Sequence, residues 1–316
     1  MSSVEGTGKY WKKEGQYMNV TRREFLKLCG VSAAAMGLSA TDLVRLEDLL
    51  ASPNGPTVIW LQGSACTGCS VSFLNRISAS APQTAAEVLT DSINLIYHPN
   101  LMALAGQDAV EELKKASTNT KFLLAVEGGV PSKFSGSTCW AWNYNGTDVT
   151  FLRAVRDLAA RAAGILCIGT CASWGGIPGA YPNPTAVKGV KAVTGKTTIN
   201  IAGCPAHPDW VAWAVVQLIL GNSISLDSYG RPRALFDRTV HDRCPRRENE
   251  EAETFGIDHL CLEELGCRGP DTKANCPVGG WNGGSNWCCE ANAPCIGCTD
   301  PKFPFAQLTS QEGSDD

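Results

Sequence analysis

Cysteine is the residue type that most constrains this chain, because the sequence holds 15 of them in 316 residues. That number is high for an ordinary cytosolic enzyme, and the chain is too long for a small disulfide scaffold. Eight of the cysteines lie in residues 231–316, where Gly, Pro and Asn are frequent and long apolar runs are few. Such a segment buries too little apolar surface to fold by itself, so we expect bound metal to stabilise it.

The first part of the sequence alternates short apolar runs with helical patterns from residue 57 to about residue 220. This alternation is typical of an α/β fold with a parallel sheet. The expected strands are 57–61, 93–97, 122–126, 165–168 and 199–201, and the expected helices are 71–78, 107–115, 151–163 and 208–220. We therefore predict an α/β domain over residues 52–230 and a mostly irregular C-terminal domain over residues 231–316.

The N-terminal region has the pattern of an export signal. Arg22 and Arg23 precede a short apolar stretch over residues 28–40, which is typical of a twin-arginine signal. We assign residues 1–51 to this signal region, although the sequence shows no good A-x-A cleavage site. The twin-arginine route carries folded proteins, so it suits a periplasmic protein that acquires its cofactor before export.

The charge of the chain argues against nucleic-acid binding, and its hydropathy argues against a membrane anchor. The chain carries 27 Lys and Arg against 31 Asp and Glu, a formal charge of −4. Nucleic-acid binding needs a basic face for the phosphates, so we expect no nucleic-acid partner. No run after the signal region reaches the roughly 18 apolar residues that span a bilayer. We therefore expect no transmembrane anchor in this chain.

Four cysteines follow strands of the expected sheet. Cys66 and Cys69 form a Cys-x-x-Cys pair after the first strand, Cys171 follows the fourth strand and Cys204 the fifth. Because the carboxyl ends of parallel strands share one edge, these thiols are expected to converge there. Four thiols can hold either zinc or a four-iron four-sulfur cluster, and the pattern favours the cluster because zinc usually sits in small knuckles. Three other cysteines are expected to ligate nothing: Cys29, Cys139 and Cys167.

The C-terminal segment offers two further sets of candidate ligands. One set combines a His-x-x-Cys pair with two later thiols: His241, Cys244, Cys261 and Cys267. His259 is the alternative imidazole, but it lies only two residues before Cys261 and is less favourable.

The other set places a Cys-x-x-Cys pair after two more distant thiols: Cys276, Cys288, Cys295 and Cys298. Without Cys288 it would suit a three-iron cluster, and the adjacent Cys289 is the alternative fourth ligand. Three sets of four ligands indicate an electron-transfer chain of three iron-sulfur clusters, all of which we expect to be four-iron clusters.

Seven motifs resemble those of the small subunit of nickel-iron hydrogenases. They are C-T-G-C-S at 66–70, E-G at 127–128, G-T-C-A-S-W-G-G-I at 169–177, G-C-P-A-H-P-D-W at 203–210, H-D-R-C-P-R-R at 241–247, G-C-R-G-P at 266–270 and P-C-I-G-C at 294–298. The resemblance covers nearly the whole chain, including the leader. It implies a flavodoxin-like domain with a proximal cluster, and an irregular domain with a medial and a distal cluster.

The resemblance also assigns the candidate ligands. It implies that the proximal cluster is held by Cys66, Cys69, Cys171 and Cys204, and the distal cluster by His241, Cys244, Cys261 and Cys267. The medial ligands that match are Cys276, Cys295 and Cys298. The site that activates H2 then belongs to a large subunit, and this chain relays electrons between that site and an external carrier such as a multihaem cytochrome c.

Two departures from the family pattern refine this expectation. In many relatives proline occupies the position of Cys288, and the medial cluster has three irons. The segment W-N-G-G-S-N-W-C at 281–288 instead resembles the nickel-iron-selenium branch, which has a medial four-iron cluster. Oxygen-tolerant relatives carry extra cysteines where this chain has Gly68 and Gly176. We therefore expect an ordinary proximal cluster and a medial four-iron cluster.

Two other functions fit parts of the pattern. The cluster-bearing subunit of a quinone oxidoreductase resembles the first domain alone, so the two ligand sets of the tail and the leader argue against it. An exported zinc-binding or disulfide-linked protein would also use many cysteines. Iron and sulfide in the purified protein would exclude that alternative.

Overall fold

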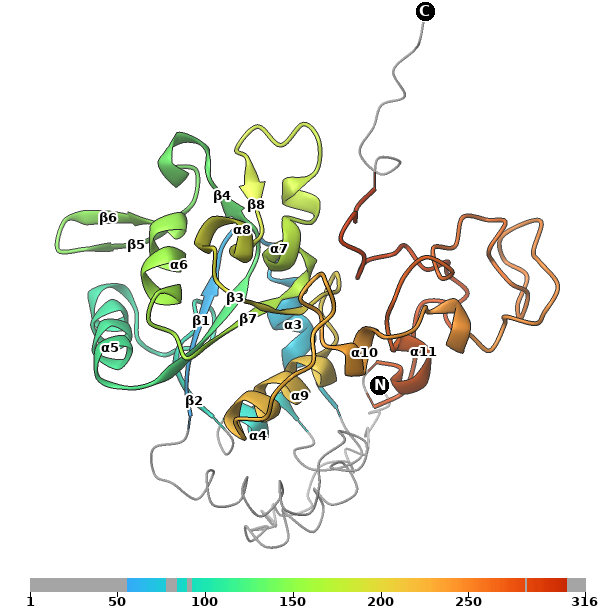
Figure 1. Ribbon diagram of the computed structural model, residues 1–316, viewed down its shortest axis with the longest axis horizontal. Helices are drawn as coiled ribbons and strands as arrows, with labels where there is room; N and C mark the ends of the chain where they lie inside the picture. The colour runs from blue at the N-terminus through green and yellow to red at the C-terminus, as the bar shows by residue number, and fades with distance from the viewer. Residues whose placement is uncertain (1–55, 78–83, 90–92, 282, 306–316) are drawn as a thin grey trace, which may run out of the picture.

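The structure is a computed structural model that describes residues 56–77, 84–89, 93–281 and 283–305 (Figure 1). The predicted signal region, with Arg22, Arg23 and Cys29, lies outside these ranges, as do the polar residues 307–316. Among the described residues, no helix combines the length and the hydropathy that crossing a membrane requires.

A parallel sheet of five strands, in the order β2-β1-β3-β7-β9, forms the centre of the first part of the chain. The strands are β1 (Thr57–Gln62), β2 (Asn94–Tyr97), β3 (Phe122–Glu127), β7 (Gly164–Ile168) and β9 (Ile199–Ile201). All five predicted strands are confirmed to within one residue at each end. The order reverses direction beside β1, so the carboxyl ends of β1 and β3 mark the edge at which such sheets bind ligands.

Helices cover both faces of the sheet because the strand residues alternate between two cores (Figure 1). Val58 and Trp60 face the side of α3 (Gly68–Leu74), α4 (Ala85–Glu87) and α9 (Pro208–Ile219). Ile59 and Leu61 face the side of α5 (Gly106–Asn119) and α6 (Phe151–Ala159). The fold is thus a mixed α/β structure with apolar strands buried on both faces.

The four predicted helices exist; the one predicted over 208–220 matches α9 to within one residue, and the other three differ more. We expected a helix over 71–78, whereas α3 begins at Gly68 and therefore contains Cys69 in its first turn; residue 78 lies outside the described ranges. The helix expected to end at residue 115 continues to Asn119 in α5. We expected another helix to reach residue 163, whereas α6 ends at Ala159. The amide of Ala163 already bonds to the carbonyl of Phe122 at the sheet, so the chain has left the helix by that point.

Several short elements complete the first part. They are β4 (Val130–Pro131), η2 (Lys133–Gly136), β5 (Trp140–Tyr144), β6 (Thr147–Thr150), α7 (Gly169–Trp174), η3 (Ile177–Gly179), β8 (Val187–Lys188) and α8 (Val190–Thr194). The hairpin of β5 and β6 was not predicted from the sequence; it turns at Asn145 and Gly146 with φ values of 50° and 75°. An Asn-Gly pair favours this left-handed turn, so the signal was present.

The described part of the tail contains only short helices: α10 (Arg233–Phe236), η4 (His241–Arg243) and α11 (Cys276–Gly279). It packs on the side of the sheet that carries α9, where Phe236 and Trp287 join the same core (Figure 1). The rings of Trp210 and Phe236 lie 5.1 Å apart, edge to face. Buried Arg231 pairs with Asp227 at 2.8 Å and donates to the carbonyl of Thr299, so a few contacts hold a segment with little regular structure.

Candidate cluster-binding sites

The proximal set, Cys66, Cys69, Cys171 and Cys204, meets at the carboxyl edge of the sheet as predicted from strand order. Cys69 lies in the first turn of α3 and Cys171 lies in α7, while Cys204 lies three residues after the end of β9. The Cys66 residue is exposed and the other three are partly buried. The set therefore sits at the surface of the molecule, with one side open toward any docked partner.

Backbone amides point at two sulfurs of the proximal set. Gly68 donates to Cys66 Sγ at 3.3 Å, and Ala206 donates to Cys69 Sγ at 3.4 Å. Close packing around the thiols needs glycine at two positions with positive φ. A Cβ on Gly169 (φ 86°) would lie 2.5 Å from Cys69 Sγ, and one on Gly176 (φ 54°) would lie 2.9 Å from Cys171 Sγ.

Glu127 organises the approach of α3 to the proximal set, a role that was not predicted from the sequence. Its carboxylate accepts bonds from the amides of Cys69 and Ser70 at 3.1 and 3.2 Å and from Trp60 Nε1 at 3.1 Å. The Ser70 hydroxyl donates to it as well. Glu127 is 1% exposed, so this buried carboxylate at the end of β3 ties the helix start to the sheet.

Burial makes three of the proximal thiols, Cys69, Cys171 and Cys204, harder to ionise. Burial raises the pKa of Cys69 well above its ordinary value, with the charge of Glu127 adding to the effect. Burial followed by the charge of Cys204 raises the pKa of Cys171 to about 12. A metal or cluster that binds here must therefore displace protons from these thiols.

The medial set, Cys276, Cys288, Cys295 and Cys298, also comes together. Burial raises the pKa of Cys276 well above its ordinary value, and the neighbouring charges of Cys298, Cys295 and Cys288 raise it further. The pKa of Cys298 rises to about 12, again through burial first and then through charges that include those of Cys295 and Cys288. Cys288 is exposed, and it lies close enough for its charge to act on the other three medial thiols and for the charge of Cys267, in the distal set, to act on it.

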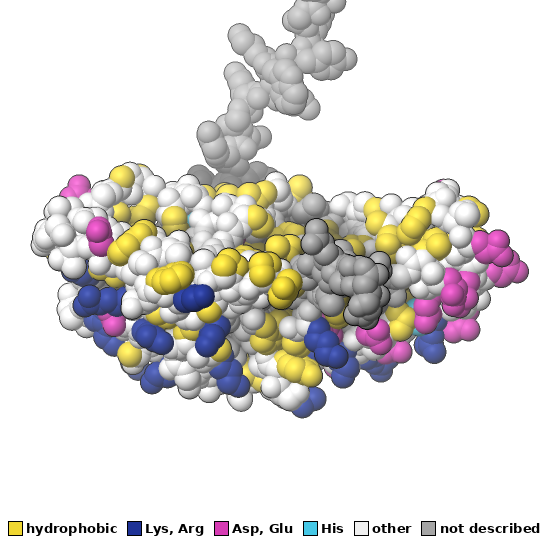
Figure 2. Space-filling model, turned by 90° about the horizontal axis from the view of Figure 1, so that it is seen from above, with side chains coloured by type: hydrophobic (Ala, Val, Ile, Leu, Met, Phe, Trp, Pro, Cys, Tyr) yellow, Lys and Arg dark blue, Asp and Glu magenta, His cyan; other side chains and the backbone are white. Residues whose placement is uncertain are grey.

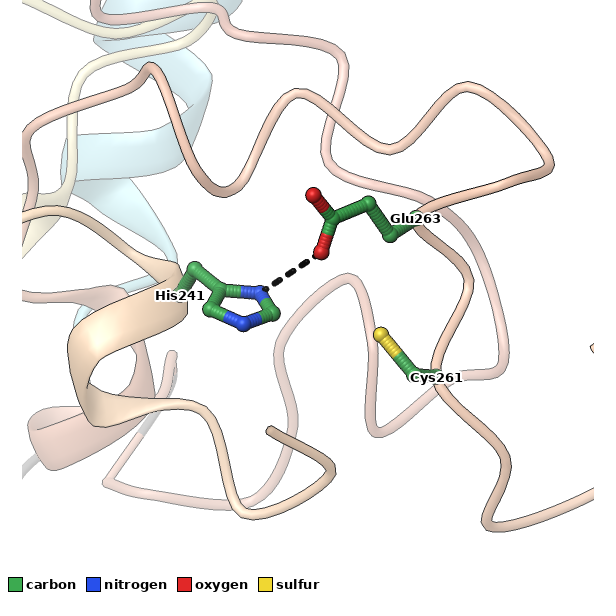
Figure 3. A group of neighbouring side chains, drawn as sticks. All are labelled: His241, Cys261 and Glu263. Atoms are coloured by element: carbon green, nitrogen blue, oxygen red, sulfur yellow. Dashed lines mark ion pairs between the residues drawn. The ribbon is translucent and has the colours of Figure 1, made fainter. Parts of the chain in front are cut away.

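The distal set, His241, Cys244, Cys261 and Cys267, lines one small cavity in the tail. His241 Nδ1 lies 3.8 Å from a carboxylate oxygen of Glu263, and Cys261 lies beside both (Figure 3). One ligand atom from each of these three residues falls within 4.8 Å of the others. The alternative imidazole, His259, is exposed, and its carbonyl accepts a bond from Asn249.

Cys289 belongs beside the distal set, although it is the chain neighbour of Cys288. It lines the same cavity. Interaction with the Cys289 side chain is the main reason that the pKa values of Cys244 and Cys267 fall to about 6. The same two interactions raise the pKa of Cys289 itself.

Hydrogen bonds connect one set to the next. The hydroxyl of Thr170, next to Cys171 of the proximal set, donates to the carbonyl of Cys298 in the medial set at 2.5 Å. The amide of Cys295, in the medial set, donates to Cys267 Sγ in the distal set at 3.2 Å. The three sets therefore form a continuous series in the order proximal, medial, distal.

The remaining cysteines that the structure describes lie apart from these sets. Cys167 is fully buried in β7, as predicted, and hydrogen-bonds to Thr198. Cys139 is partly buried and bonds to Ser64. All fourteen described cysteines are free of disulfide bonds.

The structure combines an α/β sheet that has cysteines along its binding edge with a cysteine-rich tail. This combination is that of an oxidoreductase subunit, and two sequence families match the chain. Residues 66–218 match the family described as "NADH ubiquinone oxidoreductase, 20 Kd subunit". Residues 236–309 match the family described as the C-terminal part of the NiFe/NiFeSe hydrogenase small subunit. The second match separates the chain from proteins that share the first part alone.

Similar proteins agree along most of the chain. The periplasmic NiFeSe hydrogenase small subunit of Desulfomicrobium baculatum is 37% identical over 91% of this chain and 97% of its own length. The periplasmic NiFe hydrogenase small subunit of Solidesulfovibrio fructosivorans is 38% identical over 90% of both chains. The recombinant NiFeSe hydrogenase of Desulfovibrio vulgaris Hildenborough matches with a TM-score of 0.75 at 38% identity, over 82% of this chain and 98% of that one. The chain belongs to the small subunits of the NiFe/NiFeSe hydrogenases, a family that carries iron-sulfur clusters.

Proposed function

We propose that this chain is the electron-transfer small subunit of a heterodimeric nickel-iron or nickel-iron-selenium hydrogenase and holds three four-iron clusters. The proximal, medial and distal sets would each hold one cluster, whose chemistry is to accept and release single electrons. A flavodoxin-like first domain, as the strand order suggests, and an irregular second domain would carry them. The spacing of the thiols makes an exported zinc protein the weaker alternative.

The spacing of the thiols favours clusters over single zinc ions. Sulfurs that share one tetrahedral zinc lie about 3.8 Å apart, since Zn–S bonds measure about 2.3 Å. Among the described residues, the only group with three potential ligand atoms within 4.8 Å of one another is His241, Cys261 and Glu263. The cysteine sets are therefore spread more widely than one zinc ion requires.

The observation that carries the proposal is the pair of hydrogen bonds between sets. Thr170, next to Cys171, and Cys298 bring the proximal and medial sets into contact, and Cys295 and Cys267 do the same for the medial and distal sets. Electrons cross short distances far faster than long ones, so a series of sets in contact is suited to conduction. A group of independent structural metal sites would have no need of such contacts.

The proximal end suits the docking of a large subunit. Cys66 is exposed there, and the adjoining segment of α3 and the residues after it present three exposed apolar side chains, Val71, Leu74 and Ile77. Exposed apolar groups of this size are typical of protein interfaces. We propose that a large subunit, with the H2-activating site, covers this edge.

The distal end suits an external electron carrier with a basic surface, such as a multihaem cytochrome c. Seven exposed acidic residues lie in the segments that carry the distal set: Glu248, Glu250, Glu251, Glu253, Asp258, Glu263 and Glu264. They form the acidic patch at the tail end of the molecule (Figure 2). Such a patch would steer a basic carrier toward the distal set.

Neutralising part of the acidic patch should slow the reaction with a basic cytochrome. We expect the triple variant Glu250→Gln, Glu251→Gln, Glu253→Gln to lower the second-order rate constant about tenfold at low ionic strength, because steering is lost. The difference should vanish at high salt, since exposed charges are then screened. The measurement is H2-driven cytochrome reduction by stopped flow at several salt concentrations.

A matched variant shows whether the position of the charges matters. Asp108→Asn, Glu111→Gln and Asp148→Asn together remove the same charge from exposed residues on α5 and the β5–β6 hairpin. This control should react nearly as fast as the unaltered protein. Equal slowing by both variants would mean that carriers do not dock at the distal end.

Metal analysis tests the proposed function directly. The purified heterodimer should contain about 12 iron and 12 sulfide in this chain, four of each per cluster. The chain expressed without its large subunit should neither consume nor produce H2. Colourless protein with zinc, or H2 turnover in a preparation free of nickel and of the large subunit, would contradict the proposal.

The cellular location that we propose is the periplasm or the outer face of the cytoplasmic membrane. The relatives from Desulfomicrobium baculatum and Solidesulfovibrio fructosivorans are both named periplasmic. The Arg22-Arg23 pair ahead of an apolar stretch supports export by the twin-arginine route.

A further inference from the structure

His207 is a buried histidine that belongs to none of the three ligand sets. It is 2% exposed and directly precedes α9, three residues after Cys204 of the proximal set. Its ring is stacked on that of Trp210, with the centroids 4.9 Å apart, and tilted against that of Trp281 at 4.6 Å. Because Trp210 lies in α9 and Trp281 in the tail, His207 lies where the two parts of the chain meet.

Both ring nitrogens of His207 have a partner, and the partners define which nitrogen carries the proton. Nδ1 is bonded to the amide of Asp209 at 3.2 Å, as the cap of α9. An amide N–H can only donate, so Nδ1 accepts and the proton lies on Nε2. Nε2 therefore donates to its own partner, the carbonyl of Gly280. One neutral ring thus joins the start of α9 to the tail.

The carbonyl that His207 holds belongs to a turn between two medial ligands. Gly280 follows α11, and its amide donates to the carbonyl of Cys276 at 3.0 Å. The chain can turn here only at a glycine, because φ is 55° and a Cβ would lie 2.9 Å from the Cα of Gly284. The loop that begins at this turn leads to Cys288. His207 therefore holds the medial segment at a fixed point.

The other end of the connection is attached to the proximal set. The amide of Ala206 donates to Cys69 Sγ at 3.4 Å. Asp209, in the first turn of α9, forms an ion pair with Arg76 at 2.8 Å, just after α3. The residues on both sides of His207 are thus held against α3 and the residue that follows it, and α3 contains Cys69.

We propose that His207 is a positioning residue that fixes the separation of the medial set from the proximal set through the hydrogen bond from its Nε2 to the carbonyl of Gly280. This inference rests on the proposed function, because the separation matters only if both sets hold clusters. Electron transfer slows steeply as two clusters move apart, so a relay needs a fixed separation. Gly280 is buried, and without this donor its carbonyl would turn toward water or another donor, which would move the medial segment.

Two substitutions separate the bond to Gly280 from the cap of α9. In the whole heterodimer, His207→Asn places an acceptor near the position of Nδ1 and keeps the cap, since asparagine caps helices well. Its side chain is too short to reach Gly280. His207→Gln places an amide nitrogen near the position of Nε2, so it keeps the donor and loses the cap. Both variants remove the ring, and neither adds a charge.

The magnetic interaction between the reduced proximal and medial clusters, measured by EPR, reports their separation. We expect the splitting to weaken and broaden in the asparagine variant, because the medial cluster is no longer held at one separation. The glutamine variant should keep the splitting of the unaltered protein. The amides of Gly280 and Trp281 should exchange with deuterium about fivefold faster in the asparagine variant, the factor that one ordinary hydrogen bond contributes to local opening.

Thr150→Ala is the matched control for the loss of a helix cap. The Thr150 hydroxyl accepts from the amide of Arg153 at 3.3 Å at the start of α6, on the other face of the sheet. This variant should change neither the splitting nor the exchange at Gly280. Isotope exchange between H2 and D2O needs no electron relay, so every variant should retain it. Should the asparagine variant fail to assemble, His207→Ser gives an equal cap with a smaller side chain.

Three results would overturn the inference. The first is a splitting in the asparagine variant that equals that of the unaltered protein. The second is a glutamine variant that is altered as much as the asparagine variant, or more, which would make His207 a helix cap alone. The third is loss of isotope exchange in the asparagine and serine variants, which would mean general damage to the heterodimer. An unaltered heterodimer without proximal and medial cluster signals would instead contradict the proposed function, so the two failures can be told apart.

Discussion

Replacing Cys288 with proline should convert the medial cluster from four irons to three. Proline supplies no thiolate, and the remaining medial thiols, Cys276, Cys295 and Cys298, suit a three-iron cluster. The oxidised protein should then gain a strong three-iron EPR signal, because an oxidised three-iron cluster has an unpaired spin and an oxidised four-iron cluster has none. The potential of the medial cluster should rise at the same time.

Two controls make this result specific. Cys288→Ala should give the same signal, because it removes the thiol without constraining the backbone. Cys139→Ala removes a thiol that bonds to Ser64 and lies in no set, and it should leave the spectrum unchanged. A strong three-iron signal in the unaltered protein, or an unchanged spectrum in Cys288→Pro, would refute the assignment of Cys288 as the fourth medial ligand.

Removing the carboxylate of Glu127 should destabilise the chain more than most substitutions outside the cysteine sets. Glu127→Ala leaves three buried donors and one partly buried donor without this acceptor: the Ser70 amide, the Trp60 indole, the Ser70 hydroxyl and the amide of Cys69. An unsatisfied buried donor costs about 1–3 kcal/mol, and partial access of water relieves some of that cost, so we expect a loss of about 3–5 kcal/mol. The proximal EPR signal should weaken as well, because Cys69 loses its anchor.

The denaturant midpoint of the heterodimer, measured with the proximal signal, checks this expectation. Glu127→Gln keeps one acceptor oxygen and should lose about half as much. Glu112→Ala removes a carboxylate from the surface of α5, where it pairs loosely with Lys115 at 3.6 Å, and should change the stability by less than about 0.5 kcal/mol. Equal midpoints for Glu127→Ala and Glu112→Ala would show that the buried network does not support the fold.

The sheet was predictable because each strand is a short apolar run between helical patterns. Predicting the convergence of Cys66, Cys171 and Cys204 needed only strand order and the shared edge of a parallel sheet. The helix bounds were less predictable, since α3 begins where Glu127 accepts its first amides, a contact between residues at least 57 positions apart. The β5–β6 hairpin was not predicted, although the Asn145-Gly146 pair is a turn signal. The pair lies within a stretch that was interpreted only as alternating strands and helices.

The tail was harder to predict because its apolar residues recur with neither helical nor strand spacing. Sequence spacing grouped His241 with Cys244, but it left Cys288 and Cys289 as alternatives. Cys289 lines the cavity of the distal set because of the path of an irregular segment, which tertiary packing alone decides. The pairing of His241 with Glu263 has the same origin, since nothing in the sequence marks that carboxylate among its acidic neighbours.

The order in which the chain visits its ligand sets has a consequence for biosynthesis. The chain passes the distal set at residues 241–267 before it reaches the medial set at residues 276–298, which lies between the other two in space. In the proposed relay, the ribosome therefore makes the middle set last. A polypeptide broken off near residue 270 would keep eight of the twelve candidate ligands and both ends of the proposed route, but it would lack the set that lies between them.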